Sequence, residues 1–350
     1  MPDRFNTINE DLMPSIIQLD TSTQYTPGDF DKYRSNGLVY ACDFYISGSE
    51  EWDSVPGGYQ TGWLVSVDHH GSTERMRRQI SSTTLAIEHV RRFGPATQSD
   101  TVIINHTDCD SILSSRVLSG DIEALDMFND AAIAADHTGD ANEIADLLQA
   151  LDTEPFRKHE ISYVNLQLTL DGKTDLYDPY IRKALDARLA KRDEACALVS
   201  HNRFVRSGHL AYAILTEKID GELFIPFIDE ALLIMTASPC PVDVNRWIIR
   251  LRLGKSAPAG MSLKNINIGS FDRKYSGRWN AGSNNRAGGT SLNPYNYAER
   301  LCNTFKDFLS AGNNVMGNDL EQITPQLHGI TADATSSRTG HDELNTCPAF

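Results

Sequence analysis

Acidic and histidine side chains gather at three places in the sequence, each directly after an apolar run. Asp43 follows the first run, Asp68-His69-His70 follows the second, and HTDCD at 106–110 follows the third. Carboxylates and imidazoles together are ligands that Mn²⁺, Mg²⁺ and similar divalent ions accept. Two ions that share a carboxylate can polarise a phosphoryl group and activate water, without a Ser or Cys nucleophile. These residue types therefore predict metal-dependent hydrolysis of a phosphorylated substrate.

The apolar runs at 37–47, 62–67 and 101–104 predict strands with helices between them. Ser72 or Thr73 can cap a helix that extends to about residue 93. Alternating strands and helices predict the α/β class, with a parallel sheet flanked by helices. Ligands bind at the carboxyl ends of such strands, which is where all three polar clusters fall.

Helical patterns at 112–118, 122–135 and 142–151 follow the third cluster. The segment DHTGD interrupts them and places Asp136 at a helix end. Asp140 is an alternative for the same role.

A charged, Ala-rich helix at 180–198 predicts a connection to a second, smaller α/β domain. Strands are predicted there at 209–215, 222–228, 231–237 and 246–253, and a helix at 296–309. The predicted division is a metal-binding domain over 1–198, a substrate-binding domain over 199–312, and a polar, flexible tail over 313–350.

Composition limits the classes of partner. The formal net charge of −15 argues against a broad grip on long nucleic acid, because that binding needs Lys and Arg on the phosphates. A small anionic substrate is compatible with an acidic protein that holds metal ions. No long apolar stretch or signal sequence predicts contact with a membrane, and six cysteines without a CxxC pair favour a reducing, cytoplasmic compartment.

The clusters resemble the motifs of the DHH phosphoesterases. Asp68-His69-His70 is similar to the triplet that names the family, and HTDCDS at 106–111 to its HxDxD[GS] motif. AAIAADHTGD resembles a later family segment with one His inserted, and AGSNNRAGG at 281–289 is similar to the GGGH-type loop of the family's second domain. The resemblance covers about 37–311.

The resemblance implies two divalent metal ions, with Mn²⁺ expected first and Mg²⁺ or Co²⁺ as alternatives. Asp43 would bridge them. His106 and Asp108 would complete the first site, while His69, Asp110 and Asp136 would complete the second. Asp68 would orient a histidine, and His70 would face the substrate as an acid or hydrogen-bond donor. Asn284, Arg286 and Arg278 would clamp the substrate from the second domain, across an interdomain cleft.

Two features depart from the family pattern. The HxDxD-like segment follows Asp43 and the triplet, whereas the family places it before them. Asn284 stands where the family has a phosphate-binding His, and an amide donates hydrogen bonds without charge. These departures leave open a specialised hydrolase of a non-phosphate intermediate, or a binding protein on the same scaffold.

Simpler roles remain for each candidate. Asp68 and Asp108 can cap helices, and Asp43 can simply begin a loop. The loop at 282–289 can be an ordinary hairpin, and Arg250, Arg252 and Arg273 compete with the two chosen arginines. The sequence leaves the exact substrate and the oligomeric state open.

Overall fold

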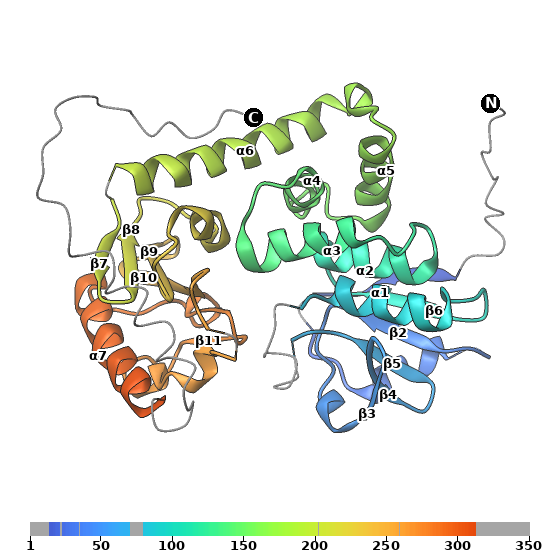
Figure 1. Ribbon diagram of the computed structural model, residues 1–350, viewed down its shortest axis with the longest axis horizontal. Coiled ribbons are helices and arrows are strands. Elements are labelled where there is room, and N and C mark those ends of the chain that lie inside the picture. The colour runs from blue at the N-terminus through green and yellow to red at the C-terminus, as the bar shows by residue number, and fades with distance from the viewer. Residues whose placement is uncertain are drawn as a thin grey trace, which may run out of the picture.

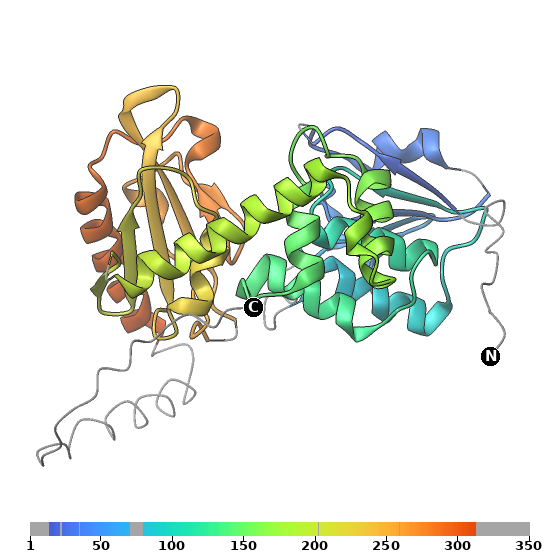
Figure 2. The ribbon, with the colours of Figure 1, turned by 90° about the horizontal axis from the view of Figure 1, so that it is seen from above.

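The computed structural model describes residues 14–312 except Ser22, Ser35, 71–79, Asn202 and Ala259. Two six-stranded mixed sheets, each with helices packed on it, form an α/β architecture with two domains. The long helix α6 (Pro179–Ser200) runs from the helices beside the first sheet to the second sheet (Figures 1 and 2). The predicted fold class is confirmed, while the exact boundaries at 198 and 312 stay predictions. The predicted tail at 313–350 lies outside the described residues.

The first sheet has the order β1-β6-β2-β5-β4-β3. Its strands are β1 (Ser15–Gln18), β2 (Val39–Cys42), β3 (Asp53–Val55), β4 (Gly58–Thr61), β5 (Leu64–Val67) and β6 (Thr101–Ile104). The pairs β1-β6, β6-β2 and β2-β5 are parallel, whereas β4 and β3 add an antiparallel edge. The three predicted strands are therefore neighbours in one parallel core.

Both faces of this parallel core are covered, which explains why its strands are apolar throughout. Alternate residues such as Val39 and Ala41 pack on one face with Phe30 and Phe44. Tyr40 and its same-face neighbours pack on the other face beneath three helices. These helices are α1 (Ser82–Phe93), α2 (Cys109–Ser119) and α3 (Asp126–Ile133).

The helix predicted from 122 begins instead at Asp126 and runs directly into a π-helical turn, Ala134–Thr138. Asp136 lies inside this wider turn. Short π segments are frequent at functional sites, because they redirect one side chain within a helix. Beyond it, α4 (Glu143–Leu151) and α5 (His159–Leu170) complete the first domain up to α6.

Two local predictions were wrong. Residues 222–228 form no strand, because Gly221–Phe227 is a 3₁₀ helix, η7, whose Pro226 has no N–H for a sheet ladder. The strand predicted over 37–47 is shorter, because β2 ends at Cys42. The chain after Asp43 leads instead to the β3-β4 hairpin, which Pro56 and Gly57 close with a φ of +78° at the glycine. The expected cap at Ser72 or Thr73 lies outside the described residues. Helix α1 begins at Ser82, after Ser81, whose Oγ accepts from Thr84 N at 3.0 Å.

The second sheet has the order β11-β12-β10-β9-β8-β7. Its strands are β7 (Val205–Ser207), β8 (Leu210–Ile214), β9 (Leu233–Cys240), β10 (Asp243–Leu253), β11 (Ser276–Gly277) and β12 (Ala281–Ser283). Helix α7 (Pro294–Gly312) contributes Tyr297 and Leu301 to the core on one face. On the other face, η7 and α6 pack over β8 and part of β9. The rest of that face looks toward the first domain.

In the described part of the chain, no helix combines the length and apolar character needed to cross a membrane.

A tight contact joins the π-helical turn to η7 of the second domain. Gly139 ends the turn with φ +66°, and a Cβ there would overlap the carbonyl oxygen of Glu222. Gly172 has a similar φ of +68°, yet a Cβ there would meet nothing within 4 Å. The two glycines thus share a backbone conformation and differ in their surroundings.

We expect Gly139→Ala to lower the free energy of unfolding by about 1–3 kcal/mol more than Gly172→Ala, because only the first must displace packed backbone. Urea denaturation of the two variants and the wild type measures this difference. Equal losses would show that the contact between the domains is loose.

Candidate metal centre

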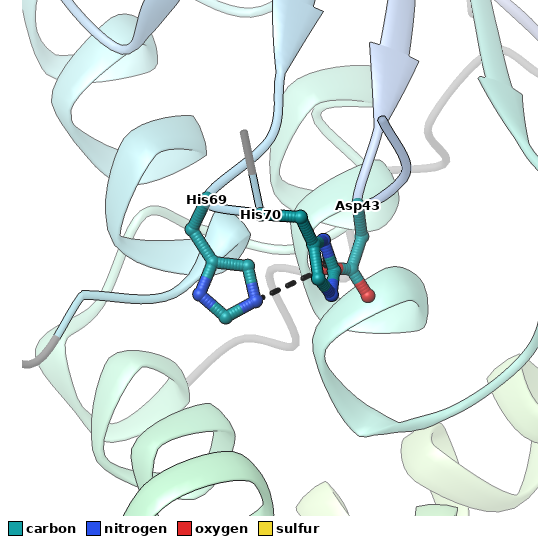
Figure 3. A group of neighbouring side chains, drawn as sticks. All are labelled: Asp43, His69 and His70. Carbon is teal, nitrogen blue, oxygen red and sulfur yellow. Dashed lines mark ion pairs between the residues drawn. The ribbon is translucent and has the colours of Figure 1, made fainter. Parts of the chain in front are cut away.

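The three parallel strands β6, β2 and β5 end side by side, and each end carries one predicted cluster. Asp43 follows β2, Asp68-His69-His70 follows β5, and residues 106–110 follow β6. Figure 3 shows Asp43 and His69 pointing toward one another from neighbouring strand ends. The last cluster in the sequence therefore lies beside Asp43 in space, because β6 pairs with β2. The unusual motif order does not separate the residues.

Two groups of potential ligands share Asp43. In the first, His106 Nε2 lies 3.1 Å from Asp43 Oδ2 and 3.2 Å from Asp108 Oδ2. In the second, His69 Nε2 lies 3.6 Å from Asp43 Oδ1, 3.3 Å from Asp136 Oδ2 and 3.6 Å from Asp110 Oδ2. Ligands of one ion with bonds of about 2.1 Å lie about 3–3.6 Å apart, and each histidine has this spacing to the carboxylates around it. Three sets of side chains lie close enough together to hold an ion: Asp43 with His106 and Asp108, Asp43 with His69 and His70, and His69 with Asp136 and His137.

Asp43 itself fits a bridging role. It is 1% exposed, and its Oδ2 makes no hydrogen bond among the described residues although His106 is near. A buried carboxylate oxygen without a donor is costly unless a cation satisfies it. Its other oxygen accepts from Ser82 Oγ at 2.9 Å. The donor set of the cluster therefore fits divalent cations.

His69 is held in a suitable orientation by the backbone. Its Nδ1 lies 2.7 Å from the carbonyl oxygen of Ile80, which can only accept, so Nδ1 carries the proton. In the neutral ring, the Nε2 lone pair then faces the carboxylates. This pairing of a metal-binding histidine with a backbone acceptor is common in metalloproteins.

The ionisation of the cluster is strongly perturbed without a cation. Burial and the charges of Asp110 and Asp108 hold the pKa of Asp43 well above its usual range. Burial opposes the charged form of His69, yet the hydrogen bond to Asp136 and the charge of Asp110 raise its pKa to about 9. Protons therefore take up part of the negative charge, and divalent ions would replace them.

Asp108 and Asp110 also anchor helices. Asp108 Oδ1 caps α2 by accepting from Ser111 N at 3.0 Å, which leaves Oδ2 toward His106. Both oxygens of Asp110 accept from the start of α1, from Ser82 N and Thr83 N at 2.7 Å each. The capping role and the ligand role are therefore compatible for Asp108. Asp110 is more fully engaged, and only the second lone pair of Oδ2 remains for an ion.

The remaining histidine of the triplet lies at the mouth of the site. His70 Nδ1 is 2.5 Å from Asp68 Oδ1, while its Nε2 is 2.8 Å from Arg278 Nη1. Arg278 reaches across from the second domain and also pairs with Asp136 Oδ2 at 3.1 Å. Burial opposes the charge on Asp136, but Arg278 and His69 hold its pKa well below the usual range. The structure thus brings Asp68, His70 and Arg278 to the metal cluster.

The other two predicted substrate-binding residues are placed differently. Arg286 is exposed and lines the cleft described below. Asn284 is fully buried; its Oδ1 accepts from Ile249 N at 2.9 Å and its Nδ2 donates to Asp272 Oδ2 at 2.9 Å. The buried amide fixes its own loop to β10 and does not line the cleft, so the structure does not place Asn284 against a substrate, contrary to the prediction.

Sequence reasoning missed several contacts that support Asp136. Its carbonyl oxygen accepts from Arg252 Nη1 at 2.7 Å and from Asn280 Nδ2 at 3.3 Å, both from the second domain. His137, predicted to be either a more distant supporting partner or simply exposed, places Nε2 3.0 Å from Ile80 O and Nδ1 3.2 Å from Asn280 Nδ2. It thus shares the Ile80 carbonyl with His69. The DHTGD segment was a local signal for His137. Arg252 was only one of three arginines that competed with the chosen pair, and Asn280 had no signal.

The site opens into an interdomain cleft of about 690 Å³. His70 and Asp108 line it from the first domain, and Arg278 lines it from the second. Most of the remaining wall belongs to η7 and to the open face of the second sheet. A phosphoryl group held between the two walls would therefore contact the ligand cluster directly.

No protein-family model matches the sequence. No curated protein matches it either. Among solved structures, the chain is similar to the pGpG-specific phosphodiesterase PggH from Vibrio cholerae. The TM-score is 0.38 at 10% identity, over 64% of this chain and 74% of that chain. A likeness of this size carries no argument about activity, so the assignment below depends on the site itself.

We expect Asp43→Asn to raise the melting temperature of the chelator-treated protein, because ionised Asp43 is disfavoured in the folded state. Asn also tolerates the positive φ of 63° at this position. Mn²⁺ should stabilise the wild type by about 2–3 kcal/mol at a hundredfold excess over Kd, and should not stabilise the variant. Thermal unfolding with and without Mn²⁺ measures both effects.

Asp186→Asn, on the exposed face of α6, is the matched control and should keep the Mn²⁺ response. If Mn²⁺ stabilises Asp43→Asn as much as the wild type, Asp43 is no ligand.

Proposed function

We propose that the chain is a divalent-metal-dependent phosphoesterase that hydrolyses a small anionic substrate, with Mn²⁺ as the first candidate ion. The observation that carries the proposal is the pair of ligand groups sharing Asp43 at three adjacent strand ends, at the edge of a cleft that Arg278 enters. The resemblance of the three clusters to DHH motifs agrees with it.

Six residues would hold the ions. His106 and Asp108 would bind one ion, His69 and Asp136 the other, with Asp43 between them; Asp110 would contribute its free lone pair to the second. When bound, the ions supply the positive charge that polarises a phosphoryl group and lowers the pKa of water. The protein supplies fixed ligand positions through the Ile80 carbonyl, the α1 N-terminus and Ser82.

Arg278 is placed to bind the phosphoryl oxygens. Its guanidinium carries five donors in a planar fork, a geometry suited to phosphate, and Nη1 already lies within 3.4 Å of both histidines of the triplet. Because Arg278 comes from the second domain and already reaches His70 and Asp136 of the first, an anion bound to it would lie between the two walls of the cleft. This would exclude water from the reacting group.

His70 is placed to donate a proton to the leaving oxygen. Protonated Nε2 is required for this, and burial disfavours it while the carboxylate of Asp68 favours it. The charge of Arg278 also opposes protonation. A substrate anion paired with Arg278 would offset that repulsion, so the imidazolium would form when the substrate is present.

We expect hydrolysis of phosphate esters by the chelator-treated protein to return with Mn²⁺, and to fall at least about a hundredfold in Asp108→Asn. Asn preserves the cap of α2 and removes only the charged ligand, so the fold should be retained. Phosphate release from a panel of monoesters, diesters and pyrophosphate measures this. Asp126→Asn on exposed α3 is the control. Tight Mn²⁺ binding without turnover of any phosphorus compound would favour the alternatives of a non-phosphate hydrolase or a binding protein.

We expect His70→Gln to lower kcat by about a hundredfold for an alkyl phosphate, whose leaving oxygen needs a proton. For 4-nitrophenyl phosphate the loss should be at most a few fold, because that leaving group departs as a stable anion. His209→Gln, at an exposed site in the second domain, should leave both rates unchanged. Equal losses for the two substrates would remove His70 from the role of acid.

A further inference from the structure

Three consecutive residues at the tip of one hairpin of the second domain reach the first domain beside the metal cluster. Arg278, Trp279 and Asn280 join β11 to β12, and a backbone hydrogen bond closes the turn. The carbonyl oxygen of Trp279 accepts from Leu263 N at 2.7 Å. The carbonyl oxygen of Asn280 accepts from Leu253 N at 2.9 Å. The tip is therefore fixed firmly to its own domain.

His137 is the residue of the first domain that this tip covers. It is 6% exposed and does not line the cleft. The ring of Trp279 lies against it, with centroids 5.4 Å apart and 33° between the planes. Asn280 Nδ2 lies 3.2 Å from His137 Nδ1 and 3.3 Å from the carbonyl oxygen of Asp136. A carbonyl only accepts, so the amide turns its NH₂ group to this side and His137 Nδ1 accepts from it.

The other ring nitrogen of His137 then carries the proton, because a neutral imidazole donates through one nitrogen and accepts through the other. His137 Nε2 lies 3.0 Å from the carbonyl oxygen of Ile80. The same oxygen accepts from His69 Nδ1 at 2.7 Å. A carbonyl oxygen has two lone pairs and can accept both bonds. One backbone carbonyl thus joins the two rings, whose centroids are 5.7 Å apart.

A continuous series of hydrogen bonds therefore leads from the second domain to a candidate metal ligand. Asn280 donates to His137, and His137 donates to the Ile80 carbonyl. That carbonyl holds the ring of His69 so that its Nε2 faces Asp43 and Asp136. The acceptor that orients His69 is thus itself held by a second ring.

We propose that His137 is a positioning residue, which Asn280 holds and which fixes the Ile80 carbonyl and so orients His69 for the ion it would share with Asp136. That an ion binds there rests on the proposed function. His137 does not line the cleft, so it acts on the ion's ligands and not on the substrate. Loss of a hydrogen bond behind a metal ligand typically weakens metal binding by about 10- to 100-fold.

The Kd for Mn²⁺, measured by calorimetry on chelator-treated protein, tests this independently of activity. Two backgrounds isolate the two ions. In Asp108→Asn, the ion that remains is the one of His69 and Asp136, and adding His137→Leu should weaken its binding by about tenfold or more. In Asp136→Asn, the remaining ion is the one of His106 and Asp108, and the same change should alter its Kd less than twofold.

A conservative variant separates positioning from packing. Gln carries an amide N–H as many bonds from the backbone as His Nε2, so His137→Gln can still donate to the Ile80 carbonyl. In the Asp108→Asn background it should keep the Kd within about threefold. A side chain that merely fills space would instead lower the melting temperature in both variants, with no difference between the two ions. That result would overturn the proposal.

His89→Leu is the matched control. His89 is also 6% exposed, its Nδ1 lies 3.3 Å from the carbonyl oxygen of Pro56, and it belongs to none of the potential ligand groups among the described residues. Its removal should lower the melting temperature and leave the Kd for Mn²⁺ unchanged in both backgrounds.

The link to the second domain is tested with Asn280→Ala. The carbonyl oxygen of Asp136 keeps its shorter bond to Arg252, at 2.7 Å, so the loss of Asn280 should act mainly through His137. In the Asp108→Asn background we expect a Kd several fold higher. Added to His137→Leu, the change should have less than a further twofold effect, because coupled residues are not additive. Fully multiplicative effects would overturn the link.

The positioning role and the proposed function fail in different ways. Equal Mn²⁺ affinity of Asp108→Asn with and without His137→Leu overturns the positioning role, and Mn²⁺-dependent hydrolysis by the wild type would still stand. A loss of affinity confined to the ion of His69 and Asp136, in a protein that hydrolyses no phosphate ester, upholds the positioning role and overturns the phosphoesterase.

Discussion

Electrostatic repulsion among buried carboxylates is the constraint that shapes this protein. Asp43, Asp110 and Asp136 all lie within 3.6 Å of His69 Nε2, and none is more than 5% exposed. Ionised carboxylates so close together oppose folding unless positive charge or directed donors offset them. The N–H groups at the start of α1 donate hydrogen bonds to Asp110, and the hydroxyl of Ser82 donates one to Asp43. The guanidinium of Arg278 forms an ion pair with Asp136. The surrounding elements of the fold thus lower the electrostatic cost of burying these carboxylates together.

The second domain is one of these elements, and it also gives the cleft its polarity. Acidic groups dominate the end of the first sheet, while arginine and lysine side chains, together with Asp220 and Glu222, line the cleft from the second domain. Under the proposed function, a phosphorylated molecule between them would meet the candidate metal ligands on one side and cations on the other. Helix α6 maintains this arrangement by pairing Arg188 and Arg192 with Asp146 of α4, and Arg188 also with Asp220 before η7. Helix α6 thus forms ion pairs with both domains.

Local sequence signals predicted the first half of the site well. The apolar runs before Asp43, His69 and His106 are indeed adjacent parallel strands, because only a doubly covered sheet needs strands that are apolar on both faces. The segment DHTGD predicted that the helix is interrupted at Asp136, but it did not predict that the interruption is a π-helical turn. The strand predicted at 222–228 was wrong, because apolar residues can pack against the sheet from a 3₁₀ helix as well as they can within a strand. Arg252, Asn280 and the role of Asn284 depend on how distant segments dock, and no local pattern encodes that.

The left-handed backbone of Asp43 has a consequence for how this protein can evolve. Asp43 is the one non-glycine residue of the described chain with a positive φ. Besides Asp itself, the residues that adopt this conformation most readily are Gly and Asn, and both lack a carboxylate. Glu would keep the charge, but it would strain the backbone and carry the oxygens too far. Nearly every single replacement at this position therefore loses either the chain conformation or the negative charge. If Asp43 bridges two ions as proposed, no gradual series of replacements leads to another bridging residue, and a lineage that loses this aspartate loses the shared ligand in one step.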